Sequence, residues 1–82
     1  MKLNNNCMVK AIVLVSIEPS HTDEIFKKVK SMQGVKEAFM VYGEYDAAFV
    51  IETEHTIGVQ DFVKGIRKLT GISRTVTLIE VT

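Results

Sequence analysis

The chain repeats its own pattern after 37 residues, and this repeat limits its possible folds more than any other sequence feature. With that shift, Ala11-Ile12-Val13-Leu14 aligns with Ala48-Phe49-Val50-Ile51, and Gly34-Val35 aligns with Gly71-Ile72. Three apolar residues within each half also align, as the pairs Ile25 with Phe62, Val29 with Ile66 and Met32 with Leu69. Each half therefore has an apolar run, an apolar stripe, a glycine and a second run.

This order predicts a strand, a helix and a strand in each half. Runs rich in Val and Ile are typical of strands, whereas apolar residues at i, i+4 and i+7 indicate one helix face. A glycine after the stripe is typical of a helix end, and we expect Ser20 or Thr22 to cap the first helix. The predicted strands are Met8–Glu18, Val35–Tyr42, Asp46–Thr53 and Ile72–Thr82, and the predicted helices run from Thr22 to Gly34 and from Thr56 to Gly71.

Two such units in series give an α+β fold of the ferredoxin-like βαββαβ type. Right-handed crossovers place both helices on one face of a four-stranded antiparallel sheet. The first strand of each half then lies in the middle, where the apolar runs Ala11–Val15 and Ala47–Ile51 fit. We expect residues 8–82 to form one domain after a flexible N-terminus of residues 1–7.

The predicted strands are apolar on both faces. Strand alternation places Val13, Phe49 and Ile79 on one set of faces and Leu14, Val50 and Leu78 on the other. Helices cover only one face of this fold, and a bare apolar face of that extent is normally an interface. The pattern therefore predicts a homodimer whose two sheets face each other, a dimeric α+β barrel.

The composition excludes several function classes. Ten basic and ten acidic residues give a net charge of zero, so no electrostatic footprint indicates nucleic acid or an anionic membrane. The apolar runs are far too short to span a bilayer, and we recognise no signal peptide. Cys7 is the only cysteine and His21 and His55 lack partners at metal spacing, so we predict no metal ligands and no cofactor. These features favour a cytoplasmic protein.

The turn between the second and third predicted strands is the candidate site. Glycine at position 43 permits a positive φ or a close approach, and Tyr42, Glu44, Tyr45 and Asp46 gather polar groups around it. A plain hairpin needs only two turn residues. Three other interpretations stay open: Gly43 only forms the turn, Asp46 bonds turn amides, and the tyrosines pack at an interface.

Four segments of the sequence resemble the effector-binding domain of the Lrp/AsnC family of transcriptional regulators, also called the RAM domain. The matching segments are Val41-Tyr42-Gly43-Glu44-Tyr45-Asp46, Asp61-Phe62-Val63, Gly71-Ile72 and Thr75-Val76-Thr77-Leu78-Ile79. The resemblance runs from about Met8 to Val81. Family members usually carry an N-terminal helix-turn-helix domain, and this sequence resembles the stand-alone form that lacks it.

The resemblance implies an amino-acid sensor that modulates transcription. Domains of this family dimerise through their sheets, associate into rings such as octamers, and bind an amino acid between dimers at the turn. The implied ligand contacts are Tyr42, Gly43, Glu44, Tyr45, Asp46, Thr75 and Thr77. Turn N–H groups could hold the ligand carboxylate and Asp46 its ammonium, whereas Thr75 and Thr77 would bond across the groove or serve only as strand formers. A DNA-binding relative would complete the regulator.

Two other functions stay open. Some dimeric α+β barrels are enzymes with a titratable group between sheet and helices. Glu18 and Glu80 lie at strand ends and no histidine lies inside a strand, so we predict no catalytic residues and no enzyme. The other alternative is a structural, partner-binding module with an empty groove.

Overall fold

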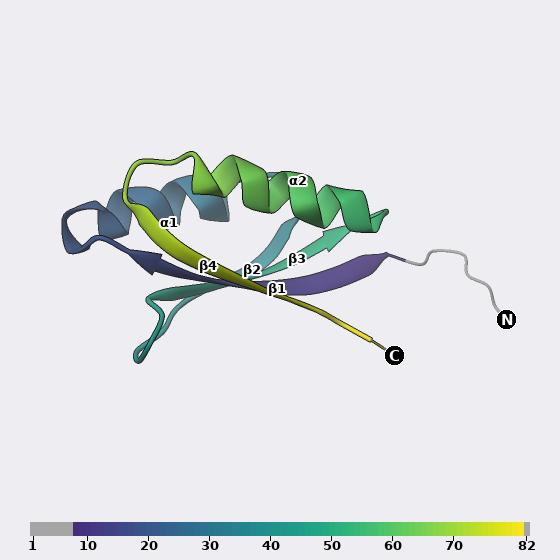
Figure 1. Ribbon diagram of the computed structural model, residues 1–82, viewed down its shortest axis with the longest axis horizontal. Helices are drawn as coiled ribbons and strands as arrows, with labels where there is room; N and C mark the ends of the chain where they lie inside the picture. Colours follow the sequence, from purple (N-terminus) through teal and green to yellow (C-terminus); the bar gives the residue numbers. More distant parts are fainter. Residues whose placement is uncertain (1–7, 82) are drawn as a thin grey trace, which may run out of the picture.

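A computed structural model describes residues 8–81 as four strands and two helices (Figure 1). The elements are β1 (Val9–Ile17), the 3₁₀ turn η1 (Pro19–His21), α1 (Thr22–Lys30), β2 (Val35–Met40), β3 (Ala47–Thr53), α2 (Thr56–Arg67) and β4 (Ile72–Ile79). The N-terminal segment 1–7, which we expected to be flexible, lies outside the described residues.

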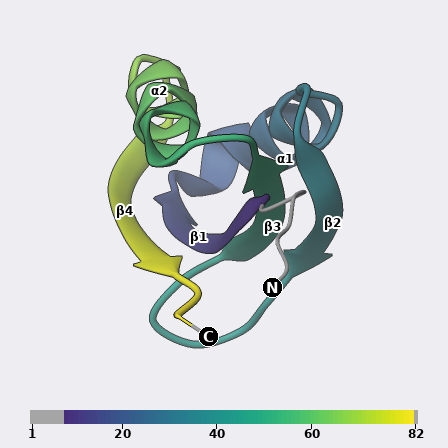
Figure 2. The same ribbon diagram turned by 90° about the vertical axis from the view of Figure 1, so that its right-hand side faces the viewer.

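The strands form one antiparallel sheet in the order β2-β3-β1-β4. Both helices lie on the same side of this sheet (Figure 2). The predicted ferredoxin-like fold is therefore confirmed, with the first strand of each half, β1 and β3, in the middle of the sheet. The edges are β2 and β4, which are the second strands of the two halves.

Both helices end earlier than the sequence predicted. We expected them to reach Gly34 and Gly71, but α1 ends at Lys30 and α2 at Arg67. The N–H groups of Met32 and Leu69 instead donate to the carbonyls three residues back, each over 3.0 Å, in tight turns. Both side chains still pack against the core. The apolar spacing thus correctly predicted that these two side chains pack against the core, but it wrongly predicted that their backbone is α-helical. Both hold together because a 3₁₀-type turn keeps the side chain on nearly the same face.

The prediction that Ser20 or Thr22 caps the first helix is wrong. The residue before α1 is His21, and no side chain bonds the free N–H groups at this end. The hydroxyl of Thr22 donates to the carbonyl of Pro19 over 3.3 Å instead. The η1 turn, which Pro19 begins, continues into α1 and replaces the expected cap.

The repeat is visible in the two helix-ending glycines. Gly34 and Gly71 both have positive φ, +96° and +108°. The carbonyl of Gly34 accepts the N–H of Glu52 over 2.9 Å, and that of Gly71 accepts the N–H of Glu18 over 2.8 Å. Each glycine therefore joins its own half to the other half, Gly34 at β3 and Gly71 at the residue that follows β1.

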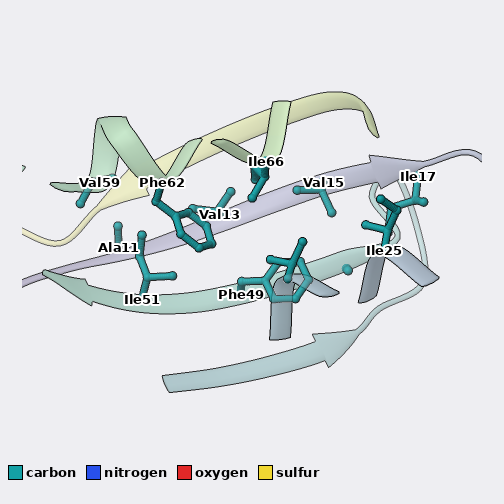
Figure 3. Close-up of a cluster of buried hydrophobic side chains, with 12 residues drawn as sticks. Ala11, Val13, Val15, Ile17, Ile25, Phe49, Ile51, Val59, Phe62 and Ile66 are labelled. Atoms are coloured by element: carbon teal, nitrogen blue, oxygen red, sulfur yellow. The ribbon is translucent and has the colours of Figure 1, made fainter. Parts of the chain in front are cut away.

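The hydrophobic core lies between the helices and the sheet (Figure 3). Val13, Phe49 and Ile51 from the central strands are fully buried against residues such as Val29 of α1 and Ile66 of α2. In residues 8–81 the core holds no buried polar or charged side chain. The side chains that we predicted to share this face do share it, because cross-strand pairs such as Val13 with Phe49 point to the same side.

The opposite face of the sheet carries two apolar rows and no helix. One row is Phe39, Ala48, Leu14 and Val76, and the next is Val50, Ile12 and Leu78, with the charged Glu37 at its β2 end. Several of these side chains are well exposed: Phe39 is 46%, Ile12 40% and Leu78 54% accessible. We call this surface the open face. Its predicted apolar character is confirmed.

Candidate functional site

The turn between β2 and β3 is fixed to the end of β1. Its two ends are joined by the N–H of Val41, which donates to the carbonyl of Asp46 over 3.0 Å. The N–H of Asp46 donates to the carbonyl of Val15, and the carboxylate Oδ2 of Asp46 accepts the N–H of Ile17, both over 2.8 Å. Asp46 therefore already holds a backbone amide, but one of β1 rather than a turn amide as the open interpretation stated, and its second carboxylate oxygen has no bond in the described structure.

The tip of the turn is open to its surroundings. Gly43 has φ +140°, and a Cβ added there would meet nothing within 4 Å. Glycine is therefore needed for the backbone conformation rather than for a close approach within the chain. Tyr42 beside it is fully exposed. The tip consequently offers its polar and aromatic groups to a ligand or to another chain.

The other half of the turn contacts β4 across the end of β1. The ring of Tyr45 stacks on the guanidinium of Arg74, with 4.8 Å from Cζ to the ring centroid. The hydroxyl of Ser16 donates to the carbonyl of Glu44 over 3.3 Å. Ser16 pairs with Arg74 on the open face, and Figure 1 shows the turn on the side of the sheet opposite the helices.

Thr75 and Thr77 lie on the other side of the sheet. They pair with Val15 and Val13 of β1, which are buried beneath the helices. Cross-strand partners point to the same side, so both threonines point toward the helix layer. Each lines a cleft at the outer edge of β4. The seven predicted contacts therefore form two separate groups in one chain: Tyr42, Gly43, Glu44, Tyr45 and Asp46 at the turn, and Thr75 and Thr77 beneath α2.

The clefts at β4 also contain residues that the sequence analysis did not single out. Arg67 at the end of α2 lines both clefts, and Lys64 one turn earlier lines one of them. Both lie in the last turn of α2, and their place within the second predicted helix was visible in the sequence. The way α2 lies over β4 was not, because no local pattern encodes the position of a helix over a sheet edge.

Two further kinds of site find no support in the described part of the chain. Residues 8–81 contain no group of three or more His, Cys, Asp or Glu side chains that could hold a metal ion. Within the same residues, neither helix is long and apolar enough to cross a membrane.

Comparison with known proteins identifies the family. The model of the Lrp/AsnC ligand binding domain matches residues 10–81. Over 68 residues, 82% of this chain, the sequence is 32% identical to the HTH-type transcriptional regulator LysM of Sulfurisphaera tokodaii. That match covers 49% of LysM, so the chain spans about half the length of this curated relative.

Solved structures give the same result. FFRP-DM1 superimposes with a TM-score of 0.84 at 35% identity, covering 89% of this chain and 99% of that one. A feast or famine regulatory protein of M. tuberculosis, complexed with L-methionine, superimposes with a TM-score of 0.78 at 18% identity, covering 100% of this chain and 58% of that one. The second likeness shows a shared fold. The family model matches residues 10–81, and LysM is 32% identical over 82% of this chain. These two matches show that this chain belongs to the Lrp/AsnC ligand-binding domain family.

Proposed function

We propose that this chain is an amino-acid sensing domain that regulates transcription through its assembly state and has no catalytic activity of its own. The family of the domain supports a regulatory sensing role. The absence of buried polar or charged side chains within the core of residues 8–81 leaves that interior without an acid, base or nucleophile. Substrate chemistry inside the fold is therefore disfavoured.

The first part of the proposal is a dimer through the open face. Exposed Phe39, Ile12 and Leu78 lie in two adjacent rows on a surface without a helix. A second copy would remove these side chains from water and close a barrel of two sheets, since closed two-fold pairing is the commonest solution for such a surface. Dimers would then associate into a ring, such as an octamer.

The second part is the ligand site, and one observation carries it. The turn is anchored to β1 by a hydrogen bond of Asp46 at its base, yet Tyr42 and the backbone at Gly43 are exposed at its tip. A preorganised, exposed polar turn is suited to binding a small zwitterion. Because Thr75 and Thr77 lie on the other side of the sheet in the same chain, the predicted site needs the turn of one chain and the threonines of another.

Two observations support an amino acid as the ligand. The M. tuberculosis protein of the same fold was solved with L-methionine. In this chain, Glu44 and the free oxygen of Asp46 are the carboxylates of the turn, and either could accept an ammonium group. Backbone N–H groups at the turn tip would donate hydrogen bonds to the carboxylate of the ligand.

Calorimetry across the twenty amino acids at millimolar concentration tests the proposal. We expect at least one to bind, and Asp46→Asn to weaken it by about 1.5–3 kcal/mol, the range for hydrogen bonds to charged groups. Asparagine is the sharper variant because its amide oxygen can still accept the N–H of Ile17, whereas Asp46→Ala also loosens the turn. Gly43→Val should weaken binding further, because a β-branched residue does not tolerate positive φ.

Two results would contradict this proposal. Binding that is equally tight in Asp46→Asn, Glu44→Gln and the wild type would place the ligand away from the turn. If no amino acid binds and the dimer persists, the chain is a structural, partner-binding module.

The third part of the proposal is that regulation requires a DNA-binding relative. Ten basic and ten acidic residues leave the chain with no net charge to attract DNA. A gel shift with this chain alone at physiological salt should show no specific complex. A complex of nanomolar affinity would contradict this part.

A further inference from the structure

Two clefts follow the outer edge of β4 beneath α2. The first has a volume of about 340 Å³ and lies beside Thr75, and the second, of about 330 Å³, lies beside Thr77. Arg67 lines both clefts, so they adjoin at its side chain. We call the two clefts together the edge groove. Its size is within the range of small-molecule sites.

The edge groove is positively charged. Its lining includes Lys64 and Arg67 and contains no aspartate or glutamate. Arg74 also lines the first cleft, but its guanidinium stacks on Tyr45 at the open face. Within residues 8–81 the one ion pair joins Lys10 to Glu52, so neither Lys64 nor Arg67 is paired with a carboxylate of these residues. The groove therefore favours an anion, and its lining has no carboxylate that could pair with an ammonium group.

The edge of β4 adds hydrogen-bond donors. The N–H of Glu80 donates to the carbonyl of Lys10 over 2.9 Å, so Glu80 is bonded toward β1. Backbone groups alternate in direction along an antiparallel strand, which turns both the N–H and the C=O groups of Thr75 and Thr77 outward, toward the groove. These donors and the two threonine hydroxyls suit a carboxylate oxygen or a neighbouring keto oxygen.

The second cleft is apolar away from Arg67. Val59 and Val63 of α2 and Ile79 of β4 line it, and Ile79 is 41% accessible. A bare ion such as phosphate would leave this part of the groove unfilled. An aliphatic chain of three or four carbons attached to the anion would cover it and remove the exposed surface of Ile79 from water.

We infer that the edge groove binds a short aliphatic carboxylate without an α-ammonium group, such as a branched 2-oxo acid. The carboxylate lies at Arg67 and the outward N–H groups of β4, and the aliphatic chain lies against Val63 and Ile79. This site is complete within one chain. It is therefore distinct from the amino-acid site proposed between chains, although the two sites would share Thr75 and Thr77.

Calorimetry with 4-methyl-2-oxopentanoate, pyruvate and leucine tests the inference on the full chain. The first compound should bind most tightly. Pyruvate, which lacks the aliphatic chain, should bind about tenfold more weakly, and leucine should bind the groove at least tenfold more weakly because its ammonium finds no acidic partner. Amide chemical shifts should move at Arg67, Thr75 and Thr77 and stay unchanged at Gly43 and Glu44.

Matched variants separate the groove from general charge effects. Arg67→Gln should weaken binding of the oxo acid by at least about tenfold, which is the effect of losing a charge-assisted hydrogen bond. Lys68→Gln removes the same charge from the next residue, which lines neither cleft, and should leave affinity within about twofold. Both residues are exposed, so each variant should fold, and circular dichroism checks this.

The outcomes distinguish this inference from the proposed function. If an amino acid binds and moves the turn amides while the oxo acid does not bind, the inference is wrong and the amino-acid proposal stands. If the oxo acid binds through Arg67 and no amino acid binds, the inference stands and the amino-acid proposal is wrong. Leucine binding as tightly as its oxo acid in an Arg67-dependent manner, or equal oxo-acid affinity in Arg67→Gln and the wild type, would also overturn the inference.

Discussion

The two faces of the sheet are built from alternate residues of the same strands, yet they differ in what covers them. On the helix face Val13 and Phe49 are completely inaccessible to solvent, whereas on the open face the neighbouring Ile12 and Leu78 remain 40% and 54% accessible. Both positions carry large aliphatic or aromatic side chains. The difference therefore comes from topology, because both crossover helices must lie on one side of the sheet.

The open face also has a polar margin. Lys10 and Glu52 pair across β1 and β3 beyond one apolar row, and Ser16 and Arg74 pair across β1 and β4 beyond the other. An apolar centre with a polar rim is the arrangement of protein interfaces. The alternating sequence therefore encodes two apolar contact surfaces. The helices of the same chain cover one of them, and the other needs a second chain to cover it.

A charge on the helix face should have the largest effect. Val13→Asp would place an unpaired carboxylate among fully buried side chains, with a cost above about 4 kcal/mol. That is comparable with the whole stability of a small domain. We expect loss of the folded far-ultraviolet circular dichroism signal. A folded Val13→Asp protein with an unchanged urea midpoint would contradict the assignment of this face as the core.

A charge on the open face should leave the fold intact and separate the dimer. Leu78→Asp adds a carboxylate that is solvated in the single chain but buried in the proposed dimer, so the dissociation constant should rise at least a hundredfold, or about 3 kcal/mol. Light scattering at micromolar concentration should report a folded monomer. If the wild type is itself a folded monomer under these conditions, the proposed dimer does not exist.

The anchor of the turn should have an intermediate effect. Asp46→Ala leaves the N–H of Ile17, now bonded over 2.8 Å, without its partner, and should lower the free energy of unfolding by about 1–2 kcal/mol. Asp46→Asn keeps an acceptor and should cost less than half as much. Thermal unfolding compares the two, and equal losses would show that charge rather than the hydrogen bond holds the turn.

The margin of the open face should have the smallest effect. Lys10 and Glu52 approach only to 4.0 Å, with side chains 47% and 29% accessible. Exposed pairs of this kind contribute about 0–1 kcal/mol. Lys10→Gln should therefore change the free energy of unfolding by less than about 0.5 kcal/mol. Urea unfolding in low and high salt measures this. A loss above 1 kcal/mol would mean that the pair is desolvated, as it would be inside the dimer interface.

Much of the fold could be predicted from the sequence because strand alternation and the repeat are local patterns with global consequences. Alternation alone assigned Val13 to one face and Leu14 to the other, and both assignments hold in the structure. The helix ends could not be predicted this way. Met32 and Leu69 satisfy helical spacing while lying in tight turns, since burial constrains the side chain and not the backbone hydrogen bond.

The candidate site was less predictable because it depends on how segments meet. The turn and the threonines were predicted as one group, but the register of β1 with β4 places Thr75 and Thr77 on the helix side. The side on which Thr77 lies could have been predicted from the sequence. Thr77 and Ile79 are two residues apart, so they lie on the same side of the strand. The position of Arg67 beside β4 could not be predicted, because it depends on how α2 lies on the sheet.

The strand order also determines how the chain must fold. Neither half of the repeat contains a sheet of its own: β1 pairs with β3 and β4, and β2 pairs with β3, so all three ladders join the two halves. Ala11 pairs with Ile79 near the opposite end of the chain. Large loops must therefore close before most strand pairs form, which slows folding and gives no half-folded state with a complete core. Although the sequence pattern is duplicated, the two halves should therefore fold and unfold together as one cooperative unit.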